Sequence, residues 1–196
     1  MAGADVSAVT QLILTERDSR DLGQWEQLGG CYWPESRVEI SWISGSGAQF
    51  VAGSIEMARR GVKARHRLGP VRVRLNGGRA LATLSCIIDI PDTLEGVEFC
   101  LSSHARLLYP LERREGRWGL MGFYGIYLRD EIITRIPGER LPIRAPELQQ
   151  FRSSYRMLSW LLTRRGGYAL NNELPGIDRP EAAEALEQKL LAWTAA

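Results

Sequence analysis

Apolar side chains in the first sixty residues recur at intervals of three and four, the period of a helix with one buried face. This pattern predicts helices over residues 6–16, from Asp21 to Gly29–Gly30, and over 50–61. Residues 37–43 instead alternate polar and apolar side chains, which predicts a strand. The first part of the chain therefore has the order helix, helix, strand, helix.

From His66 onward the period changes to two. Alternating segments predict strands over 71–75, 79–90, 97–111 and 117–129. Asn76–Gly77, Glu95–Gly96 and Glu115–Gly116 separate them, and short Gly-containing turns of this kind join antiparallel strands. Strands that follow one another through tight turns exclude a doubly wound parallel sheet, so the predicted fold class is α+β with an antiparallel meander.

The last third of the chain returns to helical spacing. Residues 146–165 predict a helix that ends at Gly166–Gly167, and Asp178 with Pro180 predicts the start of a last helix. No segment rich in Ser or Gly frees this part of the chain. We therefore expect one domain over residues 1–130 and a C-terminal helical extension, 131–196, packed on it.

Composition narrows the function classes. The 196 residues are 44% hydrophobic and 24% charged, with a net charge of +2, which is ordinary for a globular protein and too balanced for a nucleic-acid partner. No apolar run is long enough to span a membrane, so no membrane partner is expected.

The cysteine and glycine patterns argue against two further classes, metal-binding and phosphate-binding proteins. Three cysteines without C-x-x-C spacing and only two histidines argue against a metal cage and suggest reduced thiols in the cytoplasm. The segment around Gly45–Gly47 matches no phosphate-binding loop, so we expect no cofactor and no metal.

Several segments, in their order along residues 5–130, resemble the SnoaL-like family of the nuclear-transport-factor-2-like superfamily. They are 16–28 (ERDSRDLGQWEQL), 31–40 (CYWPESRVEI), Gly53, 64–68 (ARHRL) and 113–118 (RREGRW). The resemblance implies a strongly curved antiparallel sheet wrapped around the N-terminal helices as a cone with an apolar pocket. It also implies a homodimer or a higher homo-oligomer. The C-terminal helices could instead cover the open face of the sheet or close the cone.

The resemblance further implies four catalytic residues. Family enzymes with elimination chemistry, such as scytalone dehydratase, bile acid 7α-dehydratase and hexachlorocyclohexane dehydrochlorinase, share an acid from the first helices and a histidine from the second strand. Those positions look like Asp18 and His66, and Asp89 and Arg129 stand where the bile acid enzyme has further polar groups. The chain departs from the pattern at Ile13, where these enzymes carry Tyr or Lys.

These residue types suit proton abstraction. Imidazole titrates near neutral pH, and a neighbouring carboxylate such as Asp18 would orient His66 as a general base. Arg129 would stabilise a developing oxyanion, and Asp89 would hold Arg129 or donate a proton. Each residue also has a structural interpretation: His66 as an exposed histidine between two arginines, Asp18 as a helix cap, Asp89 as part of a strand end, and Arg129 in a surface ion pair.

Strand alternation suggests the pocket wall. If Arg129 points inward, then other side chains of the sheet's inner face do so too, which would suit a polyketide, steroid or terpenoid: Trp42, Phe99, Leu101, Ser103, Phe123 and Tyr127. These residues are equally suited to an ordinary core. By the same alternation His104 should point away from the pocket.

The candidate residues and the family resemblance together suggest two alternative functions. The first is a cofactor-independent lyase, isomerase or cyclase, dehydratase-like, acting on a small hydrophobic molecule. The second is a non-catalytic ligand-binding or oligomer-assembly protein of the same fold, such as the β subunits of ring-hydroxylating dioxygenases. Ile13 favours the second function, and the acid–histidine pair favours the first.

Overall fold

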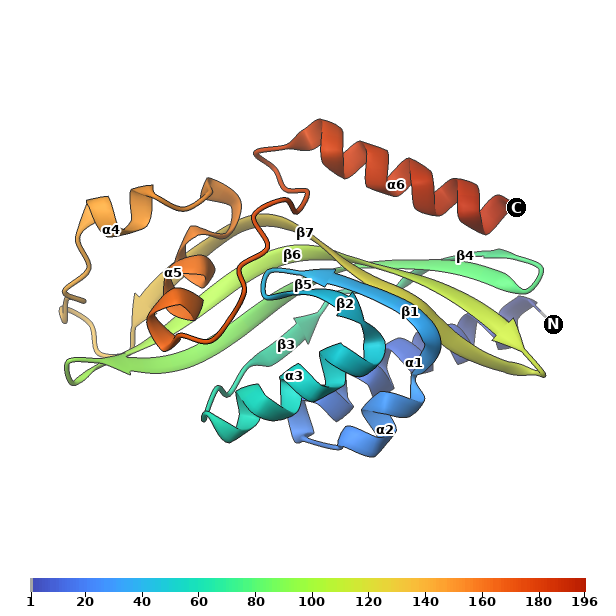
Figure 1. The fold of residues 1–196 in the computed structure, drawn as a ribbon, viewed down its shortest axis with the longest axis horizontal. Coiled ribbons are helices and arrows are strands. Elements are labelled where there is room, and N and C mark those ends of the chain that lie inside the picture. Colours follow the sequence, from blue (N-terminus) through green and yellow to red (C-terminus); the bar gives the residue numbers. More distant parts are fainter. Residues whose placement is uncertain (1) are drawn as a thin grey trace.

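A computed structural model describes residues 2–196 of the chain. A strongly curved sheet forms the middle of the molecule, with helices on both of its faces (Figure 1). The helices are α1 (Ala2–Leu22), α2 (Trp25–Gly30), α3 (Gly47–Arg59), α4 (Ala145–Gln149), α5 (Arg156–Arg165) and α6 (Pro180–Ala195), with a 3-10 turn, η1 (Ser153–Tyr155). The strands are β1 (Tyr32–Ile40), β2 (Ile43–Ser46), β3 (Arg65–Leu68), β4 (Arg72–Asn76), β5 (Arg79–Leu94), β6 (Val97–Arg114) and β7 (Arg117–Thr134).

The sheet has the strand order β2-β1-β7-β6-β5-β3, and β4 pairs with β5 beside β3. All pairs are antiparallel except β1 with β7, which is parallel. The predicted α+β class and the antiparallel meander are confirmed. The short hairpin of β1 with β2 and the parallel contact of β1 are features that the sequence pattern did not indicate.

The turns of the meander follow from residue type. Glu95 and Gly96 both have positive φ, as do Glu115 and Gly116. Two successive positive φ values are what a two-residue type I′ turn requires, and glycine supplies one of them without strain. These turns hold β5, β6 and β7 in register over most of their length.

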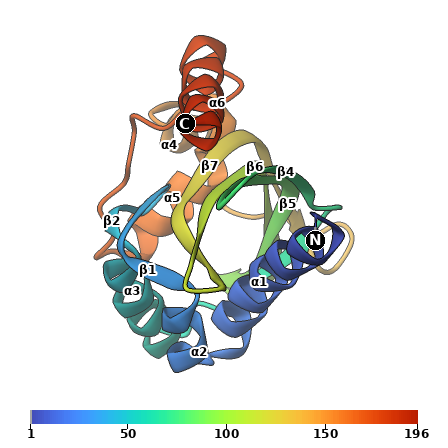
Figure 2. The same cartoon turned by 90° about the vertical axis from the view of Figure 1, so that its right-hand side faces the viewer.

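The helices divide between the two faces of the sheet. Helices α1, α2 and α3 lie against the concave face, α5 closes one end, and α6 lies on the convex face (Figures 1 and 2). On the convex face, Leu190 of α6 packs with Leu81, Leu108 and Ile126 from three neighbouring strands. Helix α6 thus covers part of the sheet face while α5 closes one end, so the C-terminal helices occupy both of the places suggested for them.

Three local predictions differ from the structure. Asp21 belongs to α1, which continues to Leu22 and ends at Gly23 with φ of 74°. The helix predicted over 146–165 is broken into α4, η1 and α5, because Tyr155 turns inward, packs at a tilt against the ring of Tyr127 and donates a hydrogen bond to the carbonyl of Asn171 at 2.7 Å. Asp178 does not cap α6 and pairs with Arg152 instead.

Strand β7 continues to Thr134, past the expected end of the first domain at residue 130. The division of the chain at that residue stays a prediction. Among the helices of residues 2–196, none combines the length and the hydropathy that crossing a membrane would need.

Candidate functional site

A small cavity lies between the concave face of the sheet and helices α1, α3 and α5. Its volume is about 50 Å³, well below the roughly 300–1,000 Å³ of pockets for drug-sized ligands. Apolar side chains make up most of the wall, and two arginines, one histidine and one tyrosine supply its ionisable groups. The wall residues are Arg17, Arg20, Ile40, Ser41, Trp42, Phe50, Met57, Val62, Ala64, His66, Ile88, Ile90, Leu107, Phe123, Tyr127, Leu158 and Leu162.

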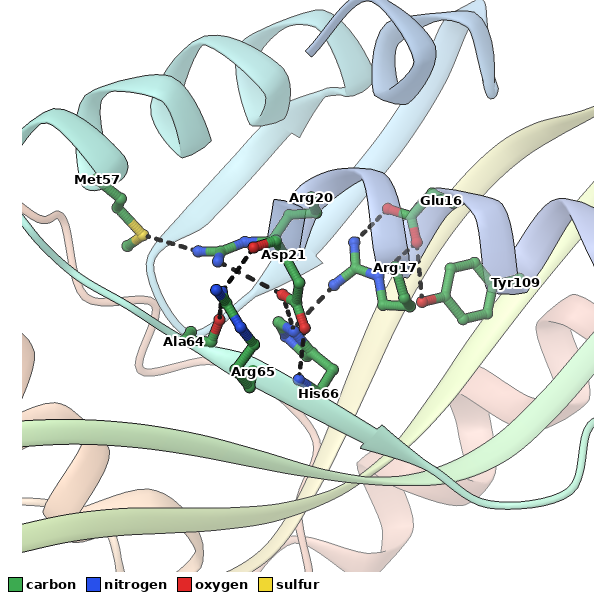
Figure 3. Close-up of polar contacts among 9 residues, drawn as sticks. All are labelled: Glu16, Arg17, Arg20, Asp21, Met57, Ala64, Arg65, His66 and Tyr109. Atoms are coloured by element: carbon green, nitrogen blue, oxygen red, sulfur yellow. Dashed lines mark hydrogen bonds and ion pairs between the residues drawn. The ribbon is translucent and has the colours of Figure 1, made fainter. Parts of the chain in front are cut away.

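His66 and Asp21 form a buried imidazole–carboxylate pair at this cavity (Figure 3). Asp21 comes from the last turn of α1 and His66 from β3. Nδ1 of His66 lies 2.7 Å from Oδ1 of Asp21, and the backbone N–H of His66 donates to Oδ2 at 2.6 Å. The side chains are 6% and 10% exposed. Both carboxylate oxygens therefore hold the same residue, which leaves the imidazole little freedom to rotate.

The charge state of the pair follows from its surroundings. Burial lowers the pKa of His66 below its ordinary value of 6.5, against the opposing effect of its hydrogen bond to Asp21, so the imidazole is neutral at neutral pH. Burial alone would raise the pKa of Asp21, but the hydrogen bonds from the ring and backbone of His66 lower it overall. An ionised carboxylate can only accept. Nδ1 therefore carries the proton, and Nε2 has the free lone pair.

A second buried charge pair lies beside the first. Arg17 and Glu16, neighbours in α1, form a bidentate ion pair with side chains 2% and 0% exposed. Tyr32 donates a hydrogen bond to Oε1 of Glu16 at 2.6 Å, and Tyr109 donates to Oε2 at 3.4 Å. Hydrogen bonds from both phenols satisfy the carboxylate, which is what a buried ion pair needs to persist.

Arg17 also connects this pair to the cavity. Its guanidinium carbon lies 4.5 Å from the ring centroid of Phe123, a cation–π distance. Nη1 of Arg17 lies 3.5 Å from Nε2 of His66 (Figure 3). Its charge therefore lies beside the basic nitrogen and, after burial, contributes to lowering the pKa of His66.

Arg20 is a further buried charge of α1 in this region. Its side chain is 8% exposed and lines the cavity. Its polar contacts are long: Nη2 lies 3.7 Å from Sδ of Met57, and Nη1 lies 3.7 Å from Oδ1 of Asp21.

The predicted partner of His66 was the wrong residue of α1. Asp18 is exposed and makes no hydrogen bond or ion pair with His66, whereas Asp21 makes both. The residue one helical turn before the acid is then Arg17, not Ile13, and Ile13 is a fully buried core residue. The polar position that had seemed missing is thus filled by a cation.

A signal for this arrangement is present in the sequence. The buried side of α1 includes Val9, Ile13, Glu16, Arg17 and Arg20, which are spaced four, three, one and three residues apart. This is one continuous helical face, but its second half is charged. A search for apolar positions alone finds this face as far as Ile13 and misses Glu16, Arg17 and Arg20.

Arg129 does not point into the cavity. Its side chain is 58% exposed and pairs with Glu131 at 3.1 Å on the surface. The register shifts between the pairs Ala105–Tyr127 and His104–Arg129, so β7 has one extra residue there. A bulge of this kind reverses the alternation of side chains beyond it. Arg129 therefore lies on the opposite face from Tyr127, contrary to the prediction.

Asp89 also lies outside the cavity wall. It accepts hydrogen bonds from Nη2 of Arg67 at 2.9 Å and from Oγ of Ser102 at 2.6 Å. The hydrogen bond with Arg67 lowers the pKa of Asp89, so this carboxyl is not poised to donate a proton near neutral pH. Its neighbours Ile88 and Ile90 line the cavity, and in a strand the residue between them faces the other side.

The predicted wall residues divide into two groups. Trp42, Phe123 and Tyr127 line the cavity, as expected. Phe99, Leu101 and Ser103 are fully buried but lie farther along β6, where Phe99 packs near Trp160 of α5. They lie in the core on the predicted side of the sheet, but they are not part of the cavity wall.

Within residues 2–196, no three His, Cys, Asp or Glu side chains are grouped closely enough to hold a metal ion. The ionisable groups at the cavity instead form an arrangement suited to moving a proton: a neutral imidazole with one basic nitrogen, a carboxylate behind it and a guanidinium in front.

Comparisons with known proteins place this architecture. Among solved structures, a hexachlorocyclohexane dehydrochlorinase of type 2 is 17% identical, with a TM-score of 0.54 over 71% of this chain and 96% of that one. A candidate scytalone dehydratase from Novosphingobium aromaticivorans is 11% identical, with a TM-score of 0.52 over 72% and 95%. An NTF2-like protein with a cystatin-like fold from the same organism is 18% identical, with a TM-score of 0.52 over 62% and 80%.

At these identities the structural likeness shows the fold alone. No curated protein matches the sequence. The SnoaL-like domain, by contrast, matches residues 3–121, which include α1, β3 and most of the sheet. Because this match covers more than half of the chain and agrees with the curved sheet and the enclosed cavity, the chain belongs to the SnoaL-like family.

Proposed function

We propose that the chain is a cofactor-independent lyase or isomerase that removes a proton beside a carbonyl group of a small hydrophobic molecule. The observation that carries this proposal is the buried His66–Asp21 pair, which leaves Nε2 unprotonated at an apolar cavity. A base positioned in this way typically contributes ~10²–10⁴-fold to the rate of proton transfer.

In the proposed reaction, Nε2 of His66 takes the proton from the carbon next to the carbonyl group. The electron pair of that C–H bond moves onto the carbonyl oxygen, and the guanidinium of Arg17 stabilises the resulting enolate. Asp21 stabilises the imidazolium through Nδ1. In an isomerisation the proton returns to another carbon.

A dehydration would complete the step differently. The enolate electrons form a carbon–carbon double bond, the β C–O bond breaks, and hydroxide leaves with the proton from Nε2 as water. The dehydrochlorinase and the candidate dehydratase of the same fold are named for eliminations, which supports this class of reaction.

The size of the cavity limits the substrate. A volume of about 50 Å³ is small for a polyketide, steroid or terpenoid ring system. Leu158 and Leu162 of α5 form part of the wall, so a substrate of that size requires α5 to move outward. Small ketones and hydroxy ketones, each with and without a carboxylate group, are therefore the first compounds to test.

The test measures proton transfer directly. Ketones are incubated with the protein in heavy water, and deuterium exchange at the α carbon is followed by NMR. β-Hydroxy ketones are assayed for enone formation by ultraviolet absorbance. Asp21→Asn should reduce either rate strongly, because an amide can donate to Nδ1 and would favour the wrong imidazole tautomer.

Asp18→Asn is the matched control, because it removes the same charge from the same helix at an exposed position. It should leave the rate unchanged. An Asp18→Asn variant as slow as Asp21→Asn, with both folded, would contradict the assigned pair. Absence of exchange and of elimination across the panel would contradict an enzymatic function.

A second candidate is a non-catalytic ligand-binding protein of the same fold. The observation that favours it is Nη1 of Arg17 at 3.5 Å from Nε2 of His66, since a donor there competes with the substrate for the lone pair. Ligand binding without proton exchange in the same panel would support this function.

We further propose a cytoplasmic, homo-oligomeric protein. The free cysteines Cys31, Cys86 and Cys100 agree with a reducing compartment. The part of the sheet formed by Leu81, Leu108 and Ile126 is not free for an oligomer contact, since α6 packs on it. Analytical ultracentrifugation of the purified chain tests the oligomeric state, and a monomer across the concentration range would contradict it.

A further inference from the structure

Arg20 is a buried cation without a strong partner. A guanidinium has five N–H donors, and buried donors are normally hydrogen-bonded. Within residues 2–196, its polar contacts are a thioether sulfur, Sδ of Met57 at 3.7 Å, and Oδ1 of Asp21 at 3.7 Å. A thioether is a weak acceptor, and the second distance is too long for a hydrogen bond. Most of its donors therefore remain available to a molecule in the cavity that the side chain lines.

The carboxylates near Arg20 are already engaged by other groups. Two buried guanidinium groups, those of Arg17 and Arg20, lie near two carboxylates, those of Glu16 and Asp21, while Arg65 is exposed to solvent. Glu16 is held by Arg17, and Asp21 is held through both oxygens by His66. Neither carboxylate therefore forms a close ion pair with Arg20.

The pKa of Arg20 reflects its burial. Burial and then the charge of Arg17 lower it to about 10, which still leaves the side chain protonated at neutral pH. Arg20 thus carries a buried positive charge at the cavity without a close counter-ion.

We propose that Arg20 binds the carboxylate group of the ligand, so that the ligands of this cavity are small apolar carboxylic acids. The planar fork of a guanidinium matches a carboxylate with two parallel hydrogen bonds. The negative charge of the ligand would pair with the guanidinium of Arg20, and the apolar wall formed by Val62, Ile88, Ile90 and Leu158 takes the organic part. This inference rests on the proposed function in one respect, that the cavity is the ligand site. Binding of a carboxylate to Arg20 does not require His66 to act as a base.

Calorimetric titration with matched probes tests the inference. Isobutyrate and benzoate are compared with isobutyramide and benzamide, which have nearly the same shape without the charge. At neutral pH the carboxylates should bind the full-length protein about tenfold more tightly or better, because hydrogen bonds between charged groups are the stronger kind.

Substitutions assign the effect to one residue. Arg20→Gln should abolish the preference for the carboxylates, and Arg20→Lys, which keeps the charge but loses the fork, should restore part of it. Arg67→Gln is the control, since Arg67 is 62% exposed and pairs with Asp89 away from the cavity. Circular dichroism of each variant checks that it is folded.

The possible results separate this inference from the proposed enzyme. Equal binding of carboxylates and amides, failure of both carboxylates to bind at millimolar concentration, or an unchanged preference in folded Arg20→Gln would each overturn it. His66→Ala should keep the preference. A preserved preference without any proton exchange would leave the carboxylate site standing and remove the enzymatic function.

Discussion

The two histidines of this chain form two imidazole–carboxylate pairs on opposite faces of one sheet. His66 and Asp21 are 2.7 Å apart with side chains 6% and 10% exposed, and His104 and Glu131 are 3.3 Å apart with side chains 20% and 42% exposed. His66 is opposite Ile88 and His104 is opposite Ile87, and successive residues of a strand face opposite sides. The same two functional groups therefore occur once at the cavity and once at the surface.

The comparison shows that burial, not residue type, gives the inner pair its chemistry. Around His66 the carboxylate holds one tautomer, burial keeps the ring neutral, and Arg17 supplies a charge beside Nε2. Around His104, water solvates and screens the pair, and exposed ion pairs contribute little. Substitutions at matched positions of the two pairs should have very different effects.

The largest difference is expected in activity. His66→Ala should reduce α-proton exchange or elimination by about 10²–10⁴-fold, because it removes the proposed base. His104→Ala, its matched control, should leave the rate within about twofold, since exposed substitutions away from the site are nearly neutral. Initial rates with the ketone panel measure both. A comparable loss in the two variants would show that the inner pair has no special role.

Stability should also separate the two faces. Glu16→Gln leaves the charge of Arg17 buried and unpaired, so the free energy of unfolding should fall by ~3–5 kcal/mol in urea titrations. Glu131→Gln at the surface should produce no measurable change. The double variant Glu16→Leu with Arg17→Met should recover much of the loss, because it removes both charges. If Glu16→Gln were as stable as the wild type, this result would contradict the buried ion pair.

The dependence of stability on pH should be smaller and has a defined sign. Because the pKa of His66 lies below 6.5 in the folded chain, the unfolded chain binds more protons just below that pH. The contribution of His66 to the free energy of unfolding should therefore decrease as the pH falls below about 6.5, while Asp130, whose pKa burial raises to about 6, acts in the opposite direction in the same range. The lowered pKa of Asp21 acts separately, because its contribution is lost only at a pH below its ordinary value of 3.8.

Urea midpoints between about pH 5 and 8 test this sign, since that range includes the titration of an unperturbed histidine. His66→Gln should remove the decrease, whereas His104→Gln should keep it. The same slope in the wild type and in His66→Gln would contradict the lowered pKa.

The smallest effect is expected at Arg129. Arg129→Gln should leave activity and stability nearly unchanged, because its side chain is 58% exposed and contacts Glu131, not the cavity. Rates and urea midpoints measure this directly. A large loss of activity would mean that the bulge in β7 rearranges when a ligand binds and turns Arg129 inward.

Part of the site could be predicted from the sequence. Helix α1 shows the limit of that prediction. Helical spacing predicted a helix over residues 6–16 with Asp18 just beyond it, but placed Asp21 at the start of the next helix. Choosing between them required the direction of the helix's inner face. That face carries Glu16, Arg17 and Arg20, so hydrophobicity did not mark it. The contacts of Tyr32 and Tyr109 with Glu16 make burial of these charges tolerable, and they join residues far apart in the chain.

Strand β7 shows the same limit. Alternation placed Phe123 and Tyr127 at the cavity correctly, but one extra residue before Arg129 reversed the pattern. Such a bulge has no local signature here, because it is set by pairing with β6.

By itself, then, the sequence determined most of the elements and the antiparallel meander, because periodicity and turn residues act over short distances, whereas the resemblance to the SnoaL-like family placed His66 at the pocket. Only the tertiary structure decided which carboxylate meets the imidazole, which arginines are buried and which face Arg129 takes. Those outcomes depend on the packing of α1 against distant strands and on a single register shift, and neither is encoded in local pattern.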